Sequence, residues 1–296
     1  MKNGPVFISS TVGLATALLL TAQVSGQVIM DRNSLDGKYA PLIESGLEIV
    51  EFTAPVGDRR VKATIASPPP NELQSDPVLL LTVGGPNTHI LPPNTVPAEF
   101  FWKHGHRVVS FEVGSMPGSL ERYRDTVLAG PDPTLTFIAE AQAVLKECVD
   151  QKWARPGRIV VTGISRYAYL AIRLMAADDT LRVGGGFAPV TDWRDLREFR
   201  EQRELDAVAD MRLSLFADRL AGKKIYLAIG NHDERVNTLS CVQFFLDLNA
   251  ANKKRGFDET RVDLFVTPDV GHTCGDEWYL RGMEILLSEA VSADAK

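Results

Sequence analysis

The feature that most constrains the fold is a regular alternation of apolar strands with helical patterns between residues 78 and 291. Predicted strands lie at 78–83, 107–113, 159–162, 183–188, 225–229 and 262–266. The continuous apolar run at 78–83 suits a strand buried on both faces, and strands that alternate with helices form parallel sheets. The sequence therefore predicts an α/β fold, a doubly wound and mostly parallel sheet with helices on both faces. Alternating runs at 47–52 and 61–66 add an antiparallel hairpin at the sheet edge.

The first 26 residues have the pattern of a signal peptide. Lys2 gives a positive start, residues 7–20 are apolar or small, and Val24-Ser25-Gly26 offers a cleavage point. A membrane anchor or a buried first helix are the alternatives, but the apolar core is short for a membrane span. We expect a secreted or periplasmic protein with no stable membrane insertion after cleavage, and one domain over residues 27–296.

Composition limits the partners and ligands. A formal net charge of −6 argues against nucleic acid held by a basic patch. Cys148, Cys241 and Cys274 have no zinc-site spacing, so no metal is expected, although a Cys241–Cys274 disulfide stays open. Residues 193–222 are dense in charge, with Leu and Phe at helical spacing. They predict a crossover helix with a small helical cap, whose charges form a solvated face.

Ser165 lies where an apolar strand passes into a helix through Gly163-Ile164-Ser165. A strand, a sharp turn with serine at its tip and a helix together make a nucleophile elbow, which projects the hydroxyl above the sheet. Such an elbow needs small residues two before and two after the serine. Gly163 meets the first need, whereas Tyr167 occupies the second position and Ala168 is small one place later.

Two further polar residues follow later strands, Asp233 and His272. Ligands bind open α/β sheets at the carboxyl ends of the strands, so these residues can meet Ser165 there. A serine hydroxyl needs a base within hydrogen-bond reach, imidazole suits that role, and a carboxylate fixes its tautomer. Asp192 also follows a strand and is the alternative acid, although a cap on the helix predicted at residue 193 is the favoured interpretation of this residue.

Three segments carry a resemblance to a known family: Gly163-Ile164-Ser165-Arg166, the 230–236 segment Gly-Asn-His-Asp-Glu-Arg-Val, and Gly271-His272. In these segments the chain resembles an α/β-hydrolase. The similar branch contains dienelactone-hydrolase-like and prolyl-oligopeptidase-like serine hydrolases, and the resemblance covers residues 45–292. It implies that Ser165 is the nucleophile, Asp233 the orienting acid and His272 the general base.

The resemblance also implies an oxyanion hole and a pocket. One donor would be the backbone N–H of Arg166. The other would be that of Gly85, because Val83-Gly84-Gly85-Pro86 is similar to the family's His-Gly-x-Pro loop and proline has no N–H. A plain tight turn is the alternative for this loop. Tyr167 and His89 are the expected substrate-binding residues.

The expected activity is hydrolysis of a small-molecule ester or peptide through an acyl-enzyme, with no metal or organic cofactor. An esterase is favoured over a peptidase, because no propeller or large gating domain precedes the catalytic unit in this sequence. The alternatives are a serine peptidase of the prolyl-oligopeptidase type and a non-catalytic binding protein on a decayed hydrolase fold. Tyr167 favours the second of these, and the order Ser165, Asp233, His272 opposes it.

Overall fold

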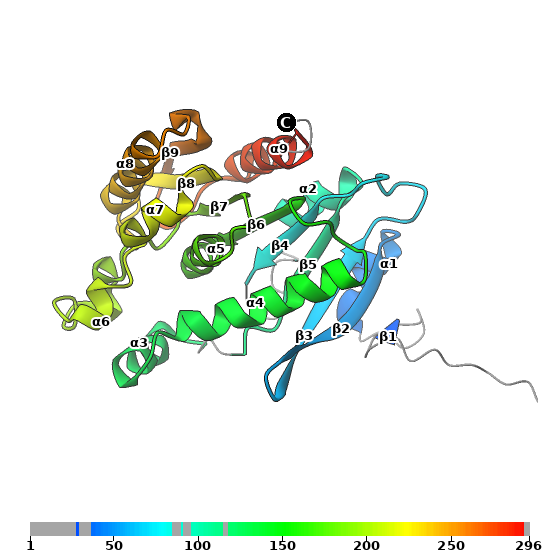
Figure 1. The fold of residues 1–296 in the computed structure, drawn as a ribbon, viewed down its shortest axis with the longest axis horizontal. Coiled ribbons are helices and arrows are strands. Elements are labelled where there is room, and N and C mark those ends of the chain that lie inside the picture. Colours follow the sequence, from blue (N-terminus) through cyan, green and yellow to red (C-terminus); the bar gives the residue numbers. More distant parts are fainter. Residues whose placement is uncertain (1–27, 30–36, 85–89, 91–95, 115–117, 293–296) are drawn as a thin grey trace, which may run out of the picture.

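The computed structural model describes residues 28–29, 37–84, 90, 96–114 and 118–292, which form a nine-stranded sheet between two layers of helices (Figure 1). The strands are β1 (Val28–Ile29), β2 (Glu48–Val56), β3 (Arg59–Ser67), β4 (Leu79–Val83), β5 (Arg107–Phe111), β6 (Ile159–Ile164), β7 (Val183–Phe187), β8 (Lys224–His232) and β9 (Val262–Val270). Their order across the sheet is β1-β2-β3-β5-β4-β6-β7-β8-β9.

The direction of the strands confirms the predicted sheet. From β5 to β9, neighbouring strands pair in parallel, whereas β1, β2 and β3 pair antiparallel. The predicted hairpin is β2 and β3, joined by a turn at Gly57. The two-residue strand β1 lies outside this hairpin and was not expected from the sequence.

The helices form one layer on each face of the sheet. They are α1 (Ala40–Glu44), α2 (Val96–Lys103), α3 (Leu120–Ala129), α4 (Pro133–Asp150), α5 (Arg166–Ala177), α6 (Asp206–Ala209), α7 (Ala217–Leu220), α8 (Thr238–Lys254) and α9 (Asp276–Ser292). One core cluster includes Phe137 of α4, Ile172 of α5 and Phe244 of α8. The other includes Phe101 of α2 and Leu286 of α9. Figure 1 shows α4 and α5 in front of the sheet. These two apolar clusters position the strands whose ends carry the candidate residues.

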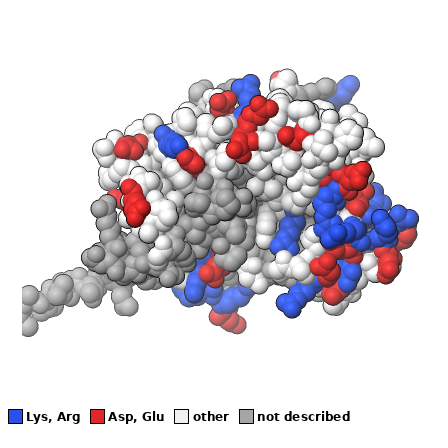
Figure 2. Space-filling view, turned by 180° about the vertical axis from the view of Figure 1, so that it is seen from behind, with Lys and Arg blue, Asp and Glu red and all other residues white. Residues whose placement is uncertain are grey.

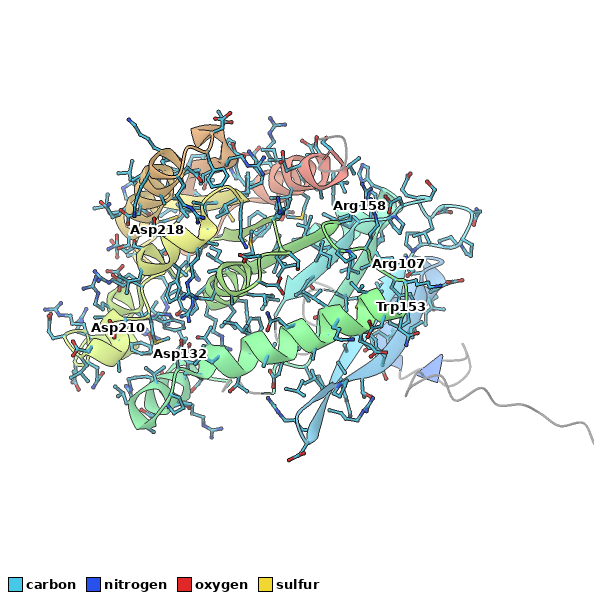
Figure 3. All side chains as sticks on the ribbon, viewed as in Figure 1. Arg107, Asp132, Trp153, Arg158, Asp210 and Asp218 are labelled. Atoms are coloured by element: carbon cyan, nitrogen blue, oxygen red, sulfur yellow. The ribbon has the colours of Figure 1, made fainter. Side chains whose placement is uncertain are left out.

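Arginines fix the amino ends of the parallel strands, opposite the ends that carry the candidate residues. Nη1 of Arg107, where β5 begins, donates to the carbonyl oxygen of Trp153 at 2.9 Å. Nη2 of Arg158, just before β6, donates to the carbonyl oxygen of Asp76 at 2.7 Å. Figure 3 shows Arg107, Trp153 and Arg158 gathered at this end of the molecule. The amino ends of the strands are therefore tied by structural hydrogen bonds, and the candidate residues lie at the carboxyl ends.

The segment between β7 and β8 corrects the prediction of a crossover helix. It holds short helical pieces of three or four residues instead: η2 (Trp193–Asp195), η3 (Arg197–Phe199), α6, η4 (Leu213–Phe216) and α7. Trp193, Phe199, Val208 and Leu213 are all buried, and their uneven spacing makes the chain turn repeatedly to bring each one inward. Most charged side chains of residues 193–222 are exposed, whereas Glu198 is buried. A mixed cluster of basic and acidic groups lies on the side where Figure 1 has α6 (Figure 2).

The predicted signal peptide, residues 1–26, lies outside the described residues. In the part of the chain that the structure does describe, no helix combines the length and the apolar character needed to cross a bilayer. Cys148, Cys241 and Cys274 are buried free thiols, so the structure forms no Cys241–Cys274 disulfide.

Candidate active site

Ser165 occupies a strained turn between β6 and α5. Its backbone has φ +57° and ψ −124°, and α5 begins at the next residue. A residue other than glycine rarely adopts positive φ, and a strained conformation costs about 1–3 kcal/mol that the surroundings must offset. Backbone hydrogen bonds supply part of that offset. Ser165 N–H donates to the carbonyl oxygen of Phe187 at 2.8 Å, and the Ser165 carbonyl accepts from Val190 N–H at 3.2 Å.

Gly163 is what lets the helix begin so close to the strand. A Cβ at Gly163 would lie 2.4 Å from the carbonyl carbon and oxygen of Tyr167 and 2.8 Å from Ala168 N. Ala168 in turn faces β7, where a Cβ on Gly186 would lie 2.8 Å from the Ala168 Cβ. The second small residue that the turn requires is therefore Ala168. The atoms of Tyr167 that lie nearest to Gly163 belong to its backbone, so the turn forms with a large side chain at this position.

His272 joins Ser165 to Asp233. Nε2 of His272 lies 2.8 Å from Ser165 Oγ, and Nδ1 lies 2.8 Å from Asp233 Oδ2. Because a carboxylate only accepts hydrogen bonds, Nδ1 carries the proton and donates it to Asp233. Nε2 is then the ring nitrogen with a lone pair, and it accepts the hydrogen bond from the Ser165 hydroxyl. This is the orientation that a base needs to take the serine proton.

Asp233 is held in a buried turn after β8. It is 2% exposed, and its Oδ1 accepts from the backbone N–H groups of Arg235 at 2.9 Å and Val236 at 3.1 Å. Thr238 accepts from Asp233 N–H at 3.2 Å and donates to the carbonyl oxygen of Gly230 at 2.6 Å. The carboxylate thus keeps hydrogen-bond partners although it is removed from water, as a buried charge requires.

The loop that carries His272 is fixed on both sides. Asp269 Oδ2 accepts from Thr267 Oγ1 at 2.7 Å before the histidine and from Gly275 N–H at 3.0 Å after it. These hydrogen bonds, with that from Thr267 the strongest, lower the pKa of Asp269. The loop packs on Gly230 of β8, where a Cβ would lie 2.8 Å from the Asp269 carbonyl oxygen. The loop that carries His272 is therefore fixed by hydrogen bonds and packing where it approaches Ser165.

Comparisons with known proteins yield matches among solved structures. No protein-family model matches the chain, and a search of the curated proteins finds no relative. A puromycin hydrolase is 21% identical with a TM-score of 0.61, over 90% of this chain and 41% of that one. A putative dipeptidyl aminopeptidase IV from Bacteroides ovatus is 15% identical with a TM-score of 0.62, over 82% of this chain and 35% of that one.

A cold-adapted esterase from an Arctic intertidal metagenomic library is 17% identical with a TM-score of 0.58, over 83% of this chain and 95% of that one. Peptidases and an esterase thus share one arrangement of strands and helices with this chain. The chain has the α/β-hydrolase fold. It spans about two fifths of the length of the peptidases that it matches.

Within the α/β-hydrolase fold, Arg166 is the first residue of the helix that follows the elbow. Its backbone N–H therefore lies at the positive end of the α5 dipole, beside Ser165. Its guanidinium donates to the carbonyl oxygen of Gly118 and to the Tyr167 hydroxyl, both at 3.0 Å. Tyr167 is half-buried and packs against the core cluster that contains α4 and α5. The other predicted oxyanion donor, Gly85, and the predicted pocket residue His89 lie outside the described residues.

The alternative acid, Asp192, is used elsewhere. Its carboxylate accepts from the backbone N–H of Arg194 at 3.0 Å, forms an ion pair with the Arg194 side chain, and so caps η2. It is Asp233, and not Asp192, that the structure brings to His272. Over the residues that the structure describes, no group of three or more His, Cys, Asp and Glu side chains is arranged to hold a metal ion.

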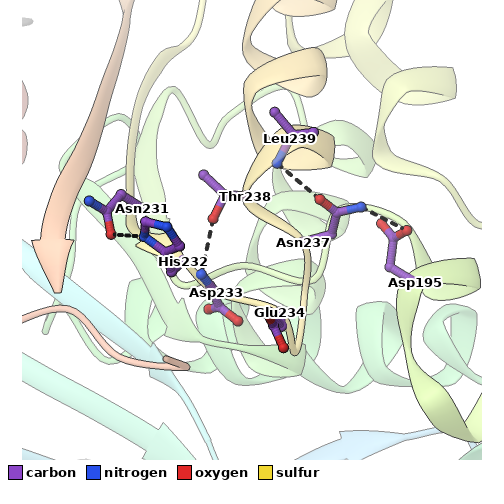
Figure 4. A pocket seen from close by; sticks show the side chains of 8 residues that line it. All are labelled: Asp195, Asn231, His232, Asp233, Glu234, Asn237, Thr238 and Leu239. Carbon is purple, nitrogen blue, oxygen red and sulfur yellow. Dashed lines mark hydrogen bonds between the residues drawn. The ribbon is translucent and has the colours of Figure 1, made fainter. Parts of the chain in front are cut away.

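An open pocket of about 390 Å³ lies on the outer side of the Asp233 turn (Figure 4). It is lined by Asp195, Asn231, His232, Asp233, Glu234, Asn237, Thr238 and Leu239. His232 Nδ1 pairs with the Asn231 side chain at 2.7 Å and is exposed, so this histidine belongs to the rim. Sequence reasoning missed the residues that hold the Asp233 turn, although Arg235 stands two places after the acid.

Proposed function

We propose that this protein is a serine hydrolase that acts by acyl transfer through Ser165, His272 and Asp233. The supporting observation is one continuous chain of hydrogen bonds: Ser165 Oγ to His272 Nε2 at 2.8 Å, and His272 Nδ1 to Asp233 Oδ2 at 2.8 Å. It begins at a serine with positive φ at the tip of a strand–helix turn. Nucleophile, base and orienting carboxylate are each within hydrogen-bond reach of the next.

In the proposed reaction Ser165 Oγ bonds to the carbonyl carbon of the substrate while its proton moves to His272 Nε2. The carbonyl π-electron pair moves onto oxygen, and the Arg166 N–H donates to that oxyanion. We also propose Gly85 as a second donor, on the resemblance of its loop to the family's oxyanion loop. Collapse expels the leaving group, which takes the proton from His272. Water then attacks the acyl-enzyme by the same route and releases the acid and Ser165.

We propose an ester as the substrate class and a peptide as the second candidate. The cold-adapted esterase, matched over 95% of its length, supports the ester. The peptidases support the second candidate, although the chain is similar to only 35–43% of their length. Turnover of p-nitrophenyl esters against p-nitroanilides with the same acyl group decides between them. Faster hydrolysis of the anilides would reverse the order that we propose.

A fluorophosphonate probe tests the mechanism itself, because it phosphonylates an activated serine irreversibly. We expect labelling of the wild type, loss of labelling in Ser165→Ala, and adduct mass on the peptide that contains Ser165. A folded wild type that neither labels nor turns over esters or anilides would refute the enzyme. It would leave the non-catalytic binding protein as the better description.

We further propose that the protein is exported, secreted or periplasmic, after removal of residues 1–26. The pattern of Lys2, the apolar stretch 7–20 and the small residues 24–26 supports this proposal.

A further inference from the structure

The Asp233 turn is attached to the segment after β7 by a buried ion pair. Glu198 of η3 has a side chain that is 5% exposed, and both of its carboxylate oxygens accept from Arg235. Arg235 Nη1 lies 2.8 Å from Oε2 and Nη2 lies 2.7 Å from Oε1, a two-bond arrangement. Arg197 also donates to Oε1 at 3.1 Å, and Arg124 of α3 donates to the Glu198 carbonyl oxygen at 3.1 Å.

This ion pair leads directly to the candidate acid. The backbone N–H of Arg235, the residue whose guanidinium Glu198 holds, donates to Asp233 Oδ1 at 2.9 Å. A second link runs beside it, because Asn237 Nδ2 donates to Asp195 Oδ1 of η2 at 3.1 Å (Figure 4). Asn237 has φ +65°, a conformation that a neighbouring contact must hold. The segment from η2 to η3 therefore holds the turn from Asp233 to Asn237 at two places, in its middle at Arg235 and at its last residue, Asn237.

The Glu198–Arg235 ion pair is strong and directional enough to fix the position of the Asp233 turn. Paired hydrogen bonds between guanidinium and carboxylate are both stronger and more directional than single neutral ones. Burial raises the pKa of Glu198, but the hydrogen bonds from Arg235, from its own backbone N–H and from Arg197 together lower that pKa to about 2. The pair therefore remains charged throughout the pH range in which a histidine base operates. Removing one partner leaves the other half-buried or buried with its charge uncompensated.

We infer that Glu198 is a positioning residue for the acid of the proposed triad. Through Arg235 it holds the turn that keeps the Asp233 carboxylate on His272 Nδ1. The inference rests on the proposed function, since it assigns Glu198 a role in that chemistry. Glu198 acts on the orientation of the imidazole and not on the substrate, so its loss changes kcat and leaves KM nearly constant.

The test compares Glu198→Gln with Glu201→Gln, an exposed residue of the same segment that serves as the matched control. Arg235→Gln and the double variant Glu198→Gln/Arg235→Gln complete a double-mutant cycle. Steady-state kinetics on a p-nitrophenyl ester give kcat and KM. Proton NMR gives a second readout that needs no substrate, because an imidazole Nδ1–H bonded to a carboxylate resonates far downfield. Its assignment to His272 is checked with Asp233→Asn.

We expect Glu198→Gln to lower kcat by about 10-fold or more, as a small misplacement of a reacting group does. KM stays within about twofold, and the downfield resonance shifts or disappears by exchange. The double variant falls no further than the poorer single variant, because the two residues act as one unit. Glu201→Gln keeps the wild-type values of all three quantities.

The inference is overturned if folded Glu198→Gln keeps both kcat and the downfield resonance, or if its loss appears in KM alone. Additive losses in the double variant also overturn it. Should Glu198→Gln not fold, Arg235→Lys, which keeps a cation beside Glu198 but loses the paired geometry, is judged by the same readouts. If the wild type shows the downfield resonance but neither labels nor turns over substrate, the proposed function is refuted and the positioning role of Glu198 is not. The resonance in the variants then still decides the role of Glu198.

Discussion

Gly163→Ala should displace the turn that carries Ser165. The new Cβ would lie 2.4 Å from the carbonyl carbon and oxygen of Tyr167, and ordinary van der Waals contact begins at 3.4 Å. The atoms that it meets are backbone atoms, so no side-chain rotation can relieve the contact. The first turn of α5 must therefore move away from β6 by about 1 Å.

A displacement of this size acts directly on the proposed chemistry. The Ser165 Oγ to His272 Nε2 distance is 2.8 Å, and a shift of the turn can lengthen it to as much as about 3.8 Å, beyond hydrogen-bond range. A misplacement of about 1 Å can cost ~100-fold in rate. Forcing a methyl group into a packed site also costs about 1–3 kcal/mol of folding stability.

The assay measures the rate of fluorophosphonate labelling, kcat on a p-nitrophenyl ester and stability in urea. Gly130→Ala is the control, since a Cβ there meets no atom within 4 Å and its φ of 179° is extended. We expect Gly163→Ala to fold, to lose about 100-fold in both rates and to be less stable. A folded Gly163→Ala that labels and turns over within twofold of the wild type would refute the reasoning on the turn.

The remaining predictions concern the acid, the N-terminus, a buried histidine and Tyr167. Asp233→Asn should lower kcat by about 10⁴-fold, whereas Asp192→Asn should change kcat little; the reverse result would move the acid to Asp192. Expression in a secreting host should give a mature N-terminus just after Gly26 by mass spectrometry, and an uncleaved chain would contradict export.

Burial lowers the pKa of His106 from 6.5 to about 4, so between these pH values the unfolded chain binds a proton that the folded protein does not. Stability in urea should therefore fall as the pH falls from 6.5 towards 4, and His106→Gln should flatten that dependence. Tyr167→Gly should keep Ser165 labelling within a few-fold but lose ~1 kcal/mol or more of stability, because glycine is a poor helix residue and the ring packs on the core.

The sequence predicted the sheet well because its strands are apolar runs bounded by clear breaks. The predicted strand at 159–162 is β6, and the helix predicted to follow Ser165 is α5. Prediction failed where tertiary packing decides the local structure. The helix α3, which was not predicted, has a polar sequence. It is fixed by contacts such as the stacking of Tyr123 on Trp193, whose ring centroids lie 4.5 Å apart although the two residues are 70 positions apart in the chain. The same long-range packing divides residues 193–222 into short pieces.

The order of Ser165, Asp233 and His272 was readable from the sequence because each follows a strand whose end must lie at the same edge. What supports them was not readable, because Glu198 reaches Arg235 across 37 positions and no local pattern marks the pair. Tyr167 was misleading for a related reason. A small residue was expected two places after Ser165, at position 167. The structure needs it at Ala168, where the helix faces β7.

Glycines at strand ends explain why three separate segments can meet at one point. Gly163 admits the backbone of α5 against β6, and Gly230 admits the His272 loop against β8, each where a Cβ would meet backbone atoms at less than 3 Å. The polar residues of the proposed triad supply the chemistry, but these two positions set how near their backbones come. Distances of 2.8 Å on both sides of His272 need backbones placed to a fraction of an ångström. A sequence that kept Ser165, Asp233 and His272 but carried alanine at 163 and 230 would therefore keep the motif and lose the geometry.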